Sequence, residues 1–298
     1  MRSNPLTLFA APGRALPSGR ARSFGPVALL ALAGLLLAGV PGCGDEAPDP
    51  DVPDRAERPA PDFELVPAPE PAPEFPDARL GIALPEEGER FSEGEMVEVH
   101  LTLSGYELGV ATPGGAERGL ARAADGQHVH LVLNDERYRA VYDLDEPVRL
   151  TGLPPGDHLL RAFPGTDWHE AVKTPGTFAV RNFHVGEGER RPLVEPDEPL
   201  LTYSRPVGEY TGADADSILV DFYLSGVRLS PEGYRVRLFV DGMGETLITS
   251  WAPHILVGLP AGEHTIGLEL LDPEGVPVPG EFNRTERTIS VAPGGREE

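Results

Sequence analysis

The chain has 298 residues and a formal net charge of −23, with a single cysteine, Cys43. The excess of acids excludes nucleic acid as a partner, because such binding depends on Lys and Arg to neutralise phosphates. The lone cysteine excludes an internal disulfide, so any folded part must depend on its own core.

Residues 1–42 predict an export leader. Residues 1–26 contain arginines and no acid, and residues 27–40, VALLALAGLLLAGV, are apolar or glycine. This is the charged start and apolar middle of a signal peptide. The apolar run would rise only about 21 Å as a helix, short of a bilayer core of roughly 30 Å, so a permanent transmembrane helix is the weaker alternative.

Cys43 follows this run in the sequence VPGC. These residues resemble the processing motif of bacterial lipoproteins, whose cysteine is acylated and becomes the mature N-terminus, although Pro41 departs from the usual small or aliphatic residue. The resemblance implies a membrane partner through lipid on Cys43, and several acyl chains anchor a protein stably. The first acid is Asp45, which in such lipoproteins favours the outer membrane; the sequence does not fix the membrane face. A chance cysteine behind an ordinary secretory signal is the alternative.

Residues 43–78 are rich in Pro and acids and poor in apolar side chains. Such a segment buries too little surface to offset the entropy of ordering it, so we predict a disordered tether. At roughly 3 Å per residue the tether could hold the folded part as far as about 100 Å from the lipid.

Strand patterns follow the tether and occur twice. Residues 96–105, MVEVHLTLSG, and residues 217–226, SILVDFYLSG, alternate in the manner of half-buried strands. Downstream, QHVHLVLND matches YRVRLFVDG and GLPPGDH matches GLPAGEH. We therefore predict an all-β protein with two tandem immunoglobulin-like antiparallel β-sandwiches, residues 79–195 and residues 196–298.

The copies differ most between their second and third strands. There the first copy is about fourteen residues longer, in a segment we call the insertion, residues 106–126. Long loops at the end of a sandwich often carry binding sites, although a tolerated insertion is equally compatible with the pattern. Any distinctive function should lie in what the copies do not share.

His128 and His130 lie on the strand QHVHLVLND, on the parity opposite to its core residues, and should point outward. Two such side chains lie about 7 Å apart and need a third ligand to hold zinc. His169, in the loop PGTDWHEAVKTPG, and His184 are the candidates, and we expect His184 to lie about 9 to 10 Å away. We therefore consider His128, His130 and His169 as a zinc or copper site, with a solvated polar face as the alternative.

His158 and His264, at the end of the repeated turn, share the parity of core residues. We predict that each imidazole bonds back to the turn backbone, in the manner of the tyrosine corner of Ig-like sandwiches, and is structural rather than catalytic.

The segments QHVHLVLND, LPPGDH and DWHE resemble those of an uncharacterised family of secreted bacterial Ig-like domains. The resemblance covers about 60 residues of the first copy. It implies the fold and an exported location, and no activity.

The sequence contains no P-loop, G-x-S-x-G or HExxH motif, so we predict neither an enzyme nor a cofactor. We expect a non-enzymatic, lipid-anchored envelope protein that binds another envelope protein or a glycan, or acts as a stalk. Trp168, His169 and Trp251 are the candidate contacts, because exposed tryptophan favours interfaces and sugars; packing within the fold is the alternative for the tryptophans. The alternative function is a periplasmic metal-binding module.

Overall fold

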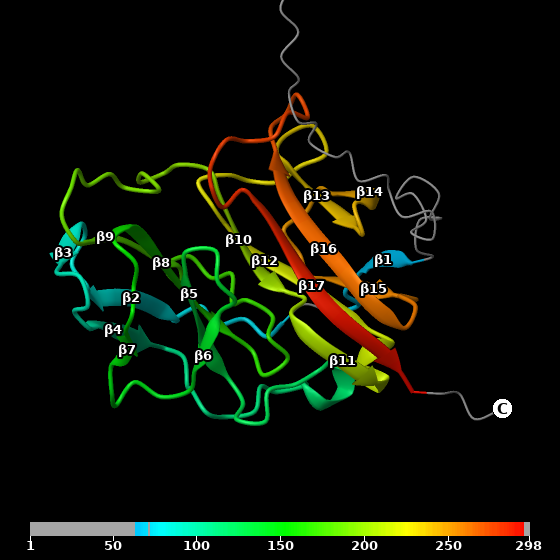
Figure 1. Cartoon of the computed structure of the whole chain (residues 1–298). Helices are drawn as coiled ribbons and strands as arrows, with labels where there is room; N and C mark the ends of the chain where they lie inside the picture. Colours follow the sequence, from blue (N-terminus) through cyan, green and yellow to red (C-terminus); the bar gives the residue numbers. More distant parts are fainter. Residues whose placement is uncertain (1–62, 71, 295–298) are drawn as a thin grey trace, which may run out of the picture. The chain divides into compact units, whose positions relative to one another are not determined.

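The structure, a computed structural model, describes residues 63–70 and 72–294, so the predicted leader and Cys43 lie outside the described residues. Nearly all regular elements are strands, and the two exceptions in the described range are short 3-10 turns, η1 (Ala116–Arg118) and η2 (Ala213–Ala215). The predicted all-β class is confirmed (Figure 1). The described residues contain no helix with the length and apolar character needed to cross a membrane.

Strands of the first copy form two sheets, ordered β2-β4-β7 and β3-β9-β8-β5-β6. Alternate residues of β4 and β5 point into the space between these sheets, where Val99, Leu131 and Leu160 join one core, as the alternation predicts. The strands are β2 (Arg79–Leu84), β3 (Glu89–Phe91), β4 (Val97–Ser104), β5 (His128–Leu133), β6 (Arg139–Val141), β7 (Val148–Leu150), β8 (Gly156–Gly165) and β9 (Ala179–Val185).

The second copy repeats this arrangement. Its larger sheet has the order β11-β17-β16-β13-β14, and its smaller sheet contains β15-β12-β10. Val220, Leu238 and Leu268 lie in the core between them. The strands are β10 (Leu200–Arg205), β11 (Gly208–Gly212), β12 (Ile218–Ser225), β13 (Arg235–Val240), β14 (Met243–Ile248), β15 (His254–Val257), β16 (Gly262–Leu271) and β17 (Arg284–Pro293).

Each copy also has one short edge strand that the sequence did not indicate. β3 pairs with β9, and β11 pairs with β17, and both pairs are parallel in sheets that are otherwise antiparallel. These strands lie in segments rich in Gly and Glu that are typical of turns. A strand of three to five residues at a sheet edge needs no alternation of apolar residues, so the pattern carried no signal for it.

The predicted tether is wrong over part of its length. β1 (Glu64–Pro67) pairs antiparallel with β15 and becomes the edge strand of the smaller sheet of the second sandwich. Leu65 packs against the core of that sandwich, and Val66 packs beside Trp168. Two apolar residues in a row, within an otherwise proline-rich segment, are enough to dock a short edge strand on an existing sheet.

The two sandwiches pack together through faces that a single domain would expose. The outer side of β5 and β8 meets β10 and β12, so that in Figure 1 these last two strands lie between the green strands and the orange ones. Phe163 of β8 packs with Tyr223 of β12, and Leu159 packs with Leu200. Residues that alternation places outside a sandwich are therefore buried in this interface.

Candidate functional site

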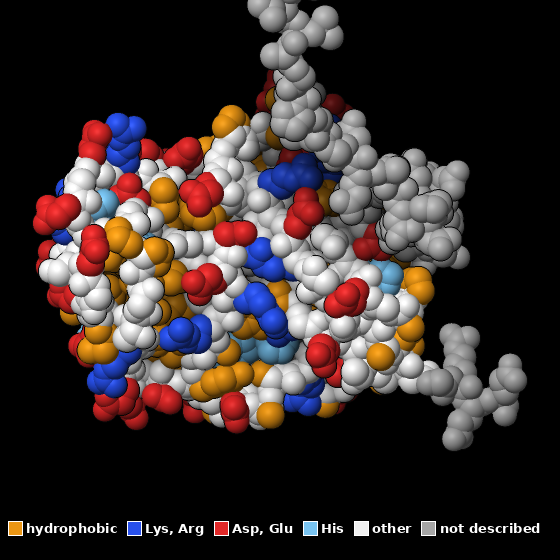
Figure 2. Space-filling model, in the orientation of Figure 1, with side chains coloured by type: hydrophobic (Ala, Val, Ile, Leu, Met, Phe, Trp, Pro, Cys, Tyr) orange, Lys and Arg blue, Asp and Glu red, His pale blue; other side chains and the backbone are white. Residues whose placement is uncertain are grey.

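His128 and His130 lie on the outer side of β5, as the alternation predicts, but they are not solvated. Both have 0% of their surface exposed. Ser204 of the second sandwich contacts His130, whereas the other rings beside His128 are those of Tyr138, Tyr142 and His169 of the first sandwich. The alternative of a solvated polar face is therefore wrong. His169 approaches them from the loop after β8 and is partly exposed. Figure 2 shows one face of the molecule, on which acidic side chains are spread widely and histidine surface is limited to small areas.

The three side chains, which we call the histidine cluster, bring three ring nitrogens together. His128 Nε2 lies 2.9 Å from His130 Nε2 and 3.2 Å from His169 Nδ1. One potential ligand atom from each of the three residues lies within 4.8 Å of the others. His184, the other candidate third ligand, bonds instead to Asp157 on the neighbouring strand, with 2.7 Å between His184 Nδ1 and Asp157 Oδ1.

The partners of His128 fix its tautomer. Its Nδ1 lies 2.8 Å from the Gly126 carbonyl oxygen, which can only accept, so Nδ1 carries the hydrogen and Nε2 presents a lone pair. That single lone pair faces two ring nitrogens at once. One linear hydrogen bond satisfies it, so the two neighbouring nitrogens would either share this one acceptor or, where one of them carries no hydrogen, face it lone pair to lone pair. A cation among the three nitrogens would satisfy all of them.

His130 can change tautomer without losing its other partner. Its Nδ1 lies 3.1 Å from the hydroxyl oxygen of Ser204, a fully buried residue of β10. A serine hydroxyl both donates and accepts, so it can bond to either tautomer of His130. In metal sites, a hydrogen bond at the ring nitrogen that does not bind the metal orients the imidazole in the same way.

Local backbone geometry allows the rings to approach so closely. Gly165 of β8 lies beside β5, and a Cβ there would come within 2.6 Å of His130 Nε2, so only glycine leaves room for that ring. His169 has a φ of +70°, in the left-handed region that few residues other than glycine adopt. Strain of this kind is often concentrated at functional sites.

Tyr138 and Arg205 complete the surroundings of the cluster. The Tyr138 ring stacks on His130, with 3.8 Å between centroids, and its hydroxyl lies 3.1 Å from His169 Nδ1. Arg205 of β10 donates to that hydroxyl. Sequence reasoning missed Tyr138, Ser204 and Arg205. The last two belong to the other sandwich, so no spacing within the first copy could have indicated them.

Burial keeps the cluster neutral. Burial is the largest influence on the pKa of each histidine: it lowers the pKa of His128 to about 4, in spite of the Gly126 carbonyl, and holds those of His130 and His169 well below the usual value. The positive charge of Arg205 lowers all three further. Burial raises the pKa of Tyr138 to about 12, and Arg205 opposes that rise. Neutral imidazoles are the form that binds metals.

The insertion holds the loop that carries His169. Thr112 Oγ1 accepts a hydrogen bond from the Asp167 amide at 3.0 Å, and the Ala123 amide donates to the Asp167 carbonyl at 2.6 Å. Arg122 pairs with the fully buried Asp167 carboxylate. The second copy lacks this insertion and has Arg235 and Arg237 in place of the histidine pair, so the insertion and the histidine pair, both specific to the first copy, lie on either side of the loop that carries His169.

The cluster fits a transition metal in size and in donor type. Imidazole nitrogens at 2.0–2.1 Å from zinc are about 3.3 to 3.6 Å from one another in tetrahedral or trigonal sites. The two contacts of His128, at 2.9 and 3.2 Å, thus need movements of only a few tenths of an ångström, while the third pair, His130 and His169, lies within 4.8 Å and has to close on a bound ion. Nitrogen donors of this kind suit zinc and copper.

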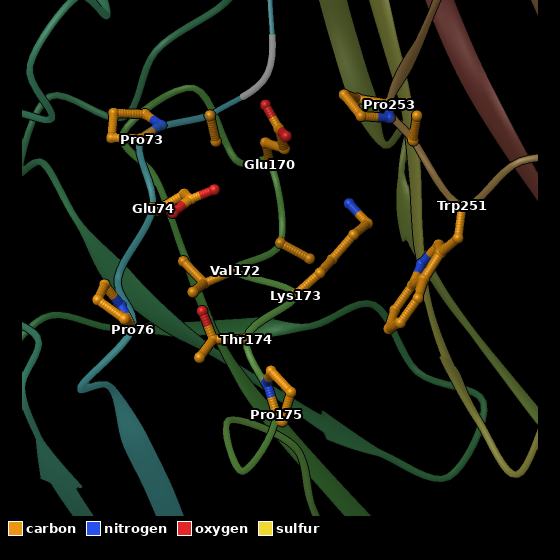
Figure 3. Close-up of a pocket in the computed structure, with 13 residues that line it drawn as sticks. Pro73, Glu74, Pro76, Glu170, Val172, Lys173, Thr174, Pro175, Trp251 and Pro253 are labelled. Atoms are coloured by element: carbon orange, nitrogen blue, oxygen red, sulfur yellow. The ribbon is translucent and has the colours of Figure 1, made fainter.

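The tryptophans are not the exposed loop tips that the sequence suggested. Trp168 is 1% exposed, donates to Glu170 and lies beneath the Arg118 guanidinium, so its expected role as an exposed contact is wrong. Trp251 is half-buried and donates to the Phe222 carbonyl. It lines one side of a pocket of about 450 Å³, opposite Pro73 and Pro76 (Figure 3).

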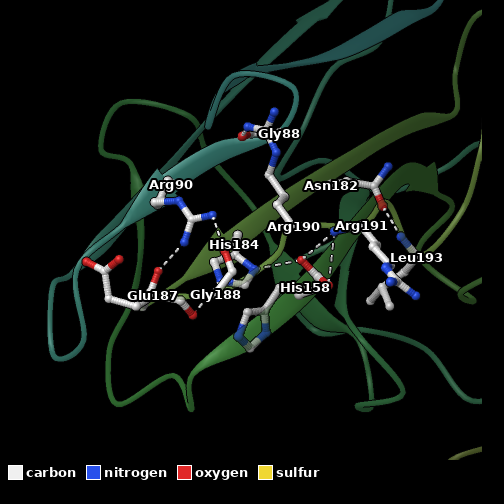
Figure 4. A network of polar contacts seen from close by, with 12 residues as sticks. Gly88, Arg90, His158, Asn182, His184, Glu187, Gly188, Arg190, Arg191 and Leu193 are labelled. Carbon is white, nitrogen blue, oxygen red and sulfur yellow. Dashed lines mark hydrogen bonds and ion pairs between the residues drawn. The ribbon is translucent and has the colours of Figure 1, made fainter.

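The repeated turn histidines have the predicted contacts. His158 Nε2 donates to the Pro154 carbonyl, and His264 Nε2 to that of Pro260, both at 2.9 Å. Figure 4 shows His158 near His184, which bonds to Asp157. The labelled residues around them include Arg90, Arg190, Arg191 and Asn182. These contacts tie turns and strand ends together.

No known family model matches the chain, and no curated protein matches it either. Among solved structures the chain is similar to fibronectin(III)-like modules of CbhA from Clostridium thermocellum, with 16% identity over 74% of this chain and 97% of that one and a TM-score of 0.26. The central fibronectin-III array of RIM-binding protein gives 11% identity, coverages of 76% and 71% and a TM-score of 0.24. SGBP-B of Bacteroides ovatus, in complex with a mixed-linkage heptasaccharide, gives 15% identity over 78% of this chain and 47% of that one, with a TM-score of 0.20. Similarity at this level says nothing of function.

Proposed function

We propose that this protein is an exported binding protein that holds a transition metal ion, zinc or copper, at His128, His130 and His169. The observation that carries the proposal is the His128 Nε2 lone pair, which faces two further ring nitrogens at 2.9 and 3.2 Å. The ring nitrogens that face away from the cluster also have partners that orient the rings: His128 Nδ1 bonds to the Gly126 carbonyl, and His130 Nδ1 bonds to the Ser204 hydroxyl.

The proposed role is to bind the metal and not to use it in catalysis. His128 and His130 are fully buried, and the cluster lies in the interface between the sandwiches. A catalytic metal needs a coordination position open to substrate. Only His169 reaches the surface, so the site suits storage, transfer or structural use of the ion.

The proposal includes anchoring by lipid on Cys43, for which the support is the sequence VPGC after an apolar run. The outer membrane is the proposed location, because Asp45 does not directly follow the cysteine. Substituting Cys43→Ala should move the protein from the detergent phase to the aqueous phase in a detergent partition of cell extracts. An unchanged partition would contradict the anchor.

Recognition of a glycan or another envelope protein is a second candidate, favoured by one observation. Trp251 is partly exposed in a pocket of about 450 Å³, together with Lys173. Because Trp168 is buried, a titration of tryptophan fluorescence with cell-wall glycan fragments should report mainly on Trp251. A signal that persists in Trp251→Phe would exclude this pocket as its source.

The metal proposal is tested by titrating the purified full-length chain, stripped with EDTA, with Zn²⁺ or with Cu⁺ under reductant. We expect one ion per chain by elemental analysis after gel filtration, and at least a hundredfold weaker binding in His130→Gln. Stripped protein that retains less than a tenth of an ion per chain with either metal would exclude the site.

His100→Gln is the matched control, because His100 lies on a strand of the same sandwich and its side chain is 43% exposed. This variant should bind the metal as the unmodified chain does. Equal losses in His100→Gln and His130→Gln would instead indicate surface binding by scattered histidines.

A further inference from the structure

Arg205 is a buried cation with no anionic partner among the described residues. It is 8% exposed, and the acceptors of its two terminal nitrogens are uncharged: the hydroxyls of Tyr138 and Tyr210 and the carbonyl of Val207. Its Nε has no partner there. A buried guanidinium normally faces a carboxylate, so its charge at this place calls for a reason.

The Tyr138 hydroxyl places this charge next to the histidine cluster. The hydroxyl accepts from Arg205 and lies 3.1 Å from His169 Nδ1, so a single oxygen atom separates the guanidinium from a ligand nitrogen. Asp167, two residues before His169, is paired with Arg122. On the other side of the loop, Asp221 is paired with Lys173 at 2.6 Å. Asp167 and Asp221 thus each have a cationic partner, whereas Arg205 has no carboxylate partner among the described residues. Glu170, next to His169, accepts a hydrogen bond from the Trp168 indole, and burial raises the pKa of its carboxyl.

We propose that the site selects a monovalent soft cation, Cu⁺, over divalent Zn²⁺, and that Arg205 determines this selectivity. The inference rests on the proposed function and specifies the ion that the site takes. Three neutral imidazoles leave the full charge of the ion in place, and Arg205 repels a dication twice as strongly as a monocation at the same position. In a buried site this difference is only weakly screened.

The number and kind of donors agree with this selectivity. Zinc sites in proteins are almost always four-coordinate, with a carboxylate, a thiolate or water in addition to imidazoles. Here three imidazoles converge, and the next oxygen, that of Tyr138, is a phenol that already bonds to Arg205. A monovalent d¹⁰ ion such as Cu⁺ accepts three nitrogen donors without a fourth ligand. The number and arrangement of the donors decide which metal a site selects more than the raw affinity does.

The test compares the two metals on the same protein. EDTA-stripped full-length chain is titrated with Cu⁺ under anaerobic reductant and with Zn²⁺, each against a chromophoric competitor, and Ag⁺ in air serves as a redox-inert monovalent probe. The unmodified chain should bind Cu⁺ and Ag⁺ at least tenfold more tightly than Zn²⁺. In Arg205→Met, which keeps the volume and removes the charge, zinc affinity should rise on the order of tenfold to a hundredfold relative to that for Cu⁺.

Arg205→Lys is the control, because it keeps the charge and loses the forked hydrogen bonds. It should keep the preference for the monovalent ions, whereas a misfolded variant would lose both metals together. Tighter binding of Zn²⁺ by the unmodified chain, or an unchanged affinity ratio in Arg205→Met, would overturn the inference and leave the metal site standing. Failure to bind any of the three ions would instead overturn the proposed function.

Discussion

At the scale of single residues, the hydrogen bond from His128 Nδ1 to the Gly126 carbonyl determines the chemistry of the cluster. It leaves the Nε2 lone pair facing the other two rings. Burial then keeps the rings neutral, so a metal ion meets little competition from protons above the pKa of about 4 that His128 has. The same burial makes the stability of the metal-free protein depend on pH.

The metal-free protein should lose stability as the pH falls from 7.5 to 5.5. An unfolded histidine takes up a proton near pH 6.5, whereas folded His128 does so only near pH 4, so the unfolded state binds more protons across this range. The expected loss is about 1 kcal/mol for each buried histidine of the cluster. Urea unfolding of stripped protein at the two pH values measures it. A smaller loss in His128→Gln would support this origin, and an equal loss would contradict it.

The turn histidines should affect stability and leave metal binding intact. His158→Ala removes the bond to the Pro154 carbonyl and the packing of its ring on Phe183, and should lower the free energy of unfolding by about 1 to 3 kcal/mol. Metal content at pH 7.5 should stay at the level of the unmodified chain. A loss of metal without a loss of stability would show that His158 has a functional role.

At the scale of elements, the insertion is the segment of the first copy that holds the loop carrying His169. Its residues Thr112 and Ala123 bond to the amide and the carbonyl of Asp167, which lies two residues before His169. A loop with a strained residue at its tip stays ordered only when neighbouring structure holds it, and the insertion supplies that support.

Thr112→Val should therefore weaken metal binding from a distance. It keeps the shape of the side chain and removes the oxygen that accepts from the Asp167 amide. We expect a dissociation constant about tenfold higher with the fold retained, because the loop loses one of its buried hydrogen bonds. Thr102→Val, at an exposed position of β4, is the control. Equal affinities in the two variants would contradict the supporting role of the insertion.

β1 offers a separate test of the fold. Val66 packs with Trp168, Leu219 and Ile255, so Val66→Asp should place a carboxylate against these apolar side chains. We expect a destabilisation of about 1 to 3 kcal/mol in urea unfolding. Glu64→Asp, at an exposed position of the same strand, should have little effect. If Val66→Asp also left stability unchanged, β1 would not be docked on the second sandwich in solution.

The sequence predicted the elements with side-chain alternation and missed those without it. β4, β5, β12 and β13 show the expected parity, and the turn histidines bond as expected. β1, β3 and β11 are short edge strands, which depend on a sheet that is already present and carry little pattern of their own. The histidine cluster was identified by residue, yet its burial and its partners Ser204 and Arg205 were not.

At the scale of the whole molecule, the packing of the two sandwiches against each other is what creates the site. Alternation distinguishes the inside of a sandwich from its outside, but it contains no information about which outer face a second domain covers. Here the second sandwich packs on the outer side of β5 and β8, and it brings Ser204 to His130 and Arg205 to Tyr138. The proposed metal site thus has residues of both copies around it, although its three proposed ligands come from one.

The central claim is that one metal ion is held by the three ring nitrogens of the histidine cluster. X-ray absorption spectroscopy of the full-length chain, loaded with one equivalent of Cu⁺, tests it most directly. An ion held by the histidine cluster should show three nitrogen ligands at about 2.0 Å and the outer-shell scattering of imidazole rings. A shell without imidazole scattering, or one dominated by sulfur from Cys43, would contradict it.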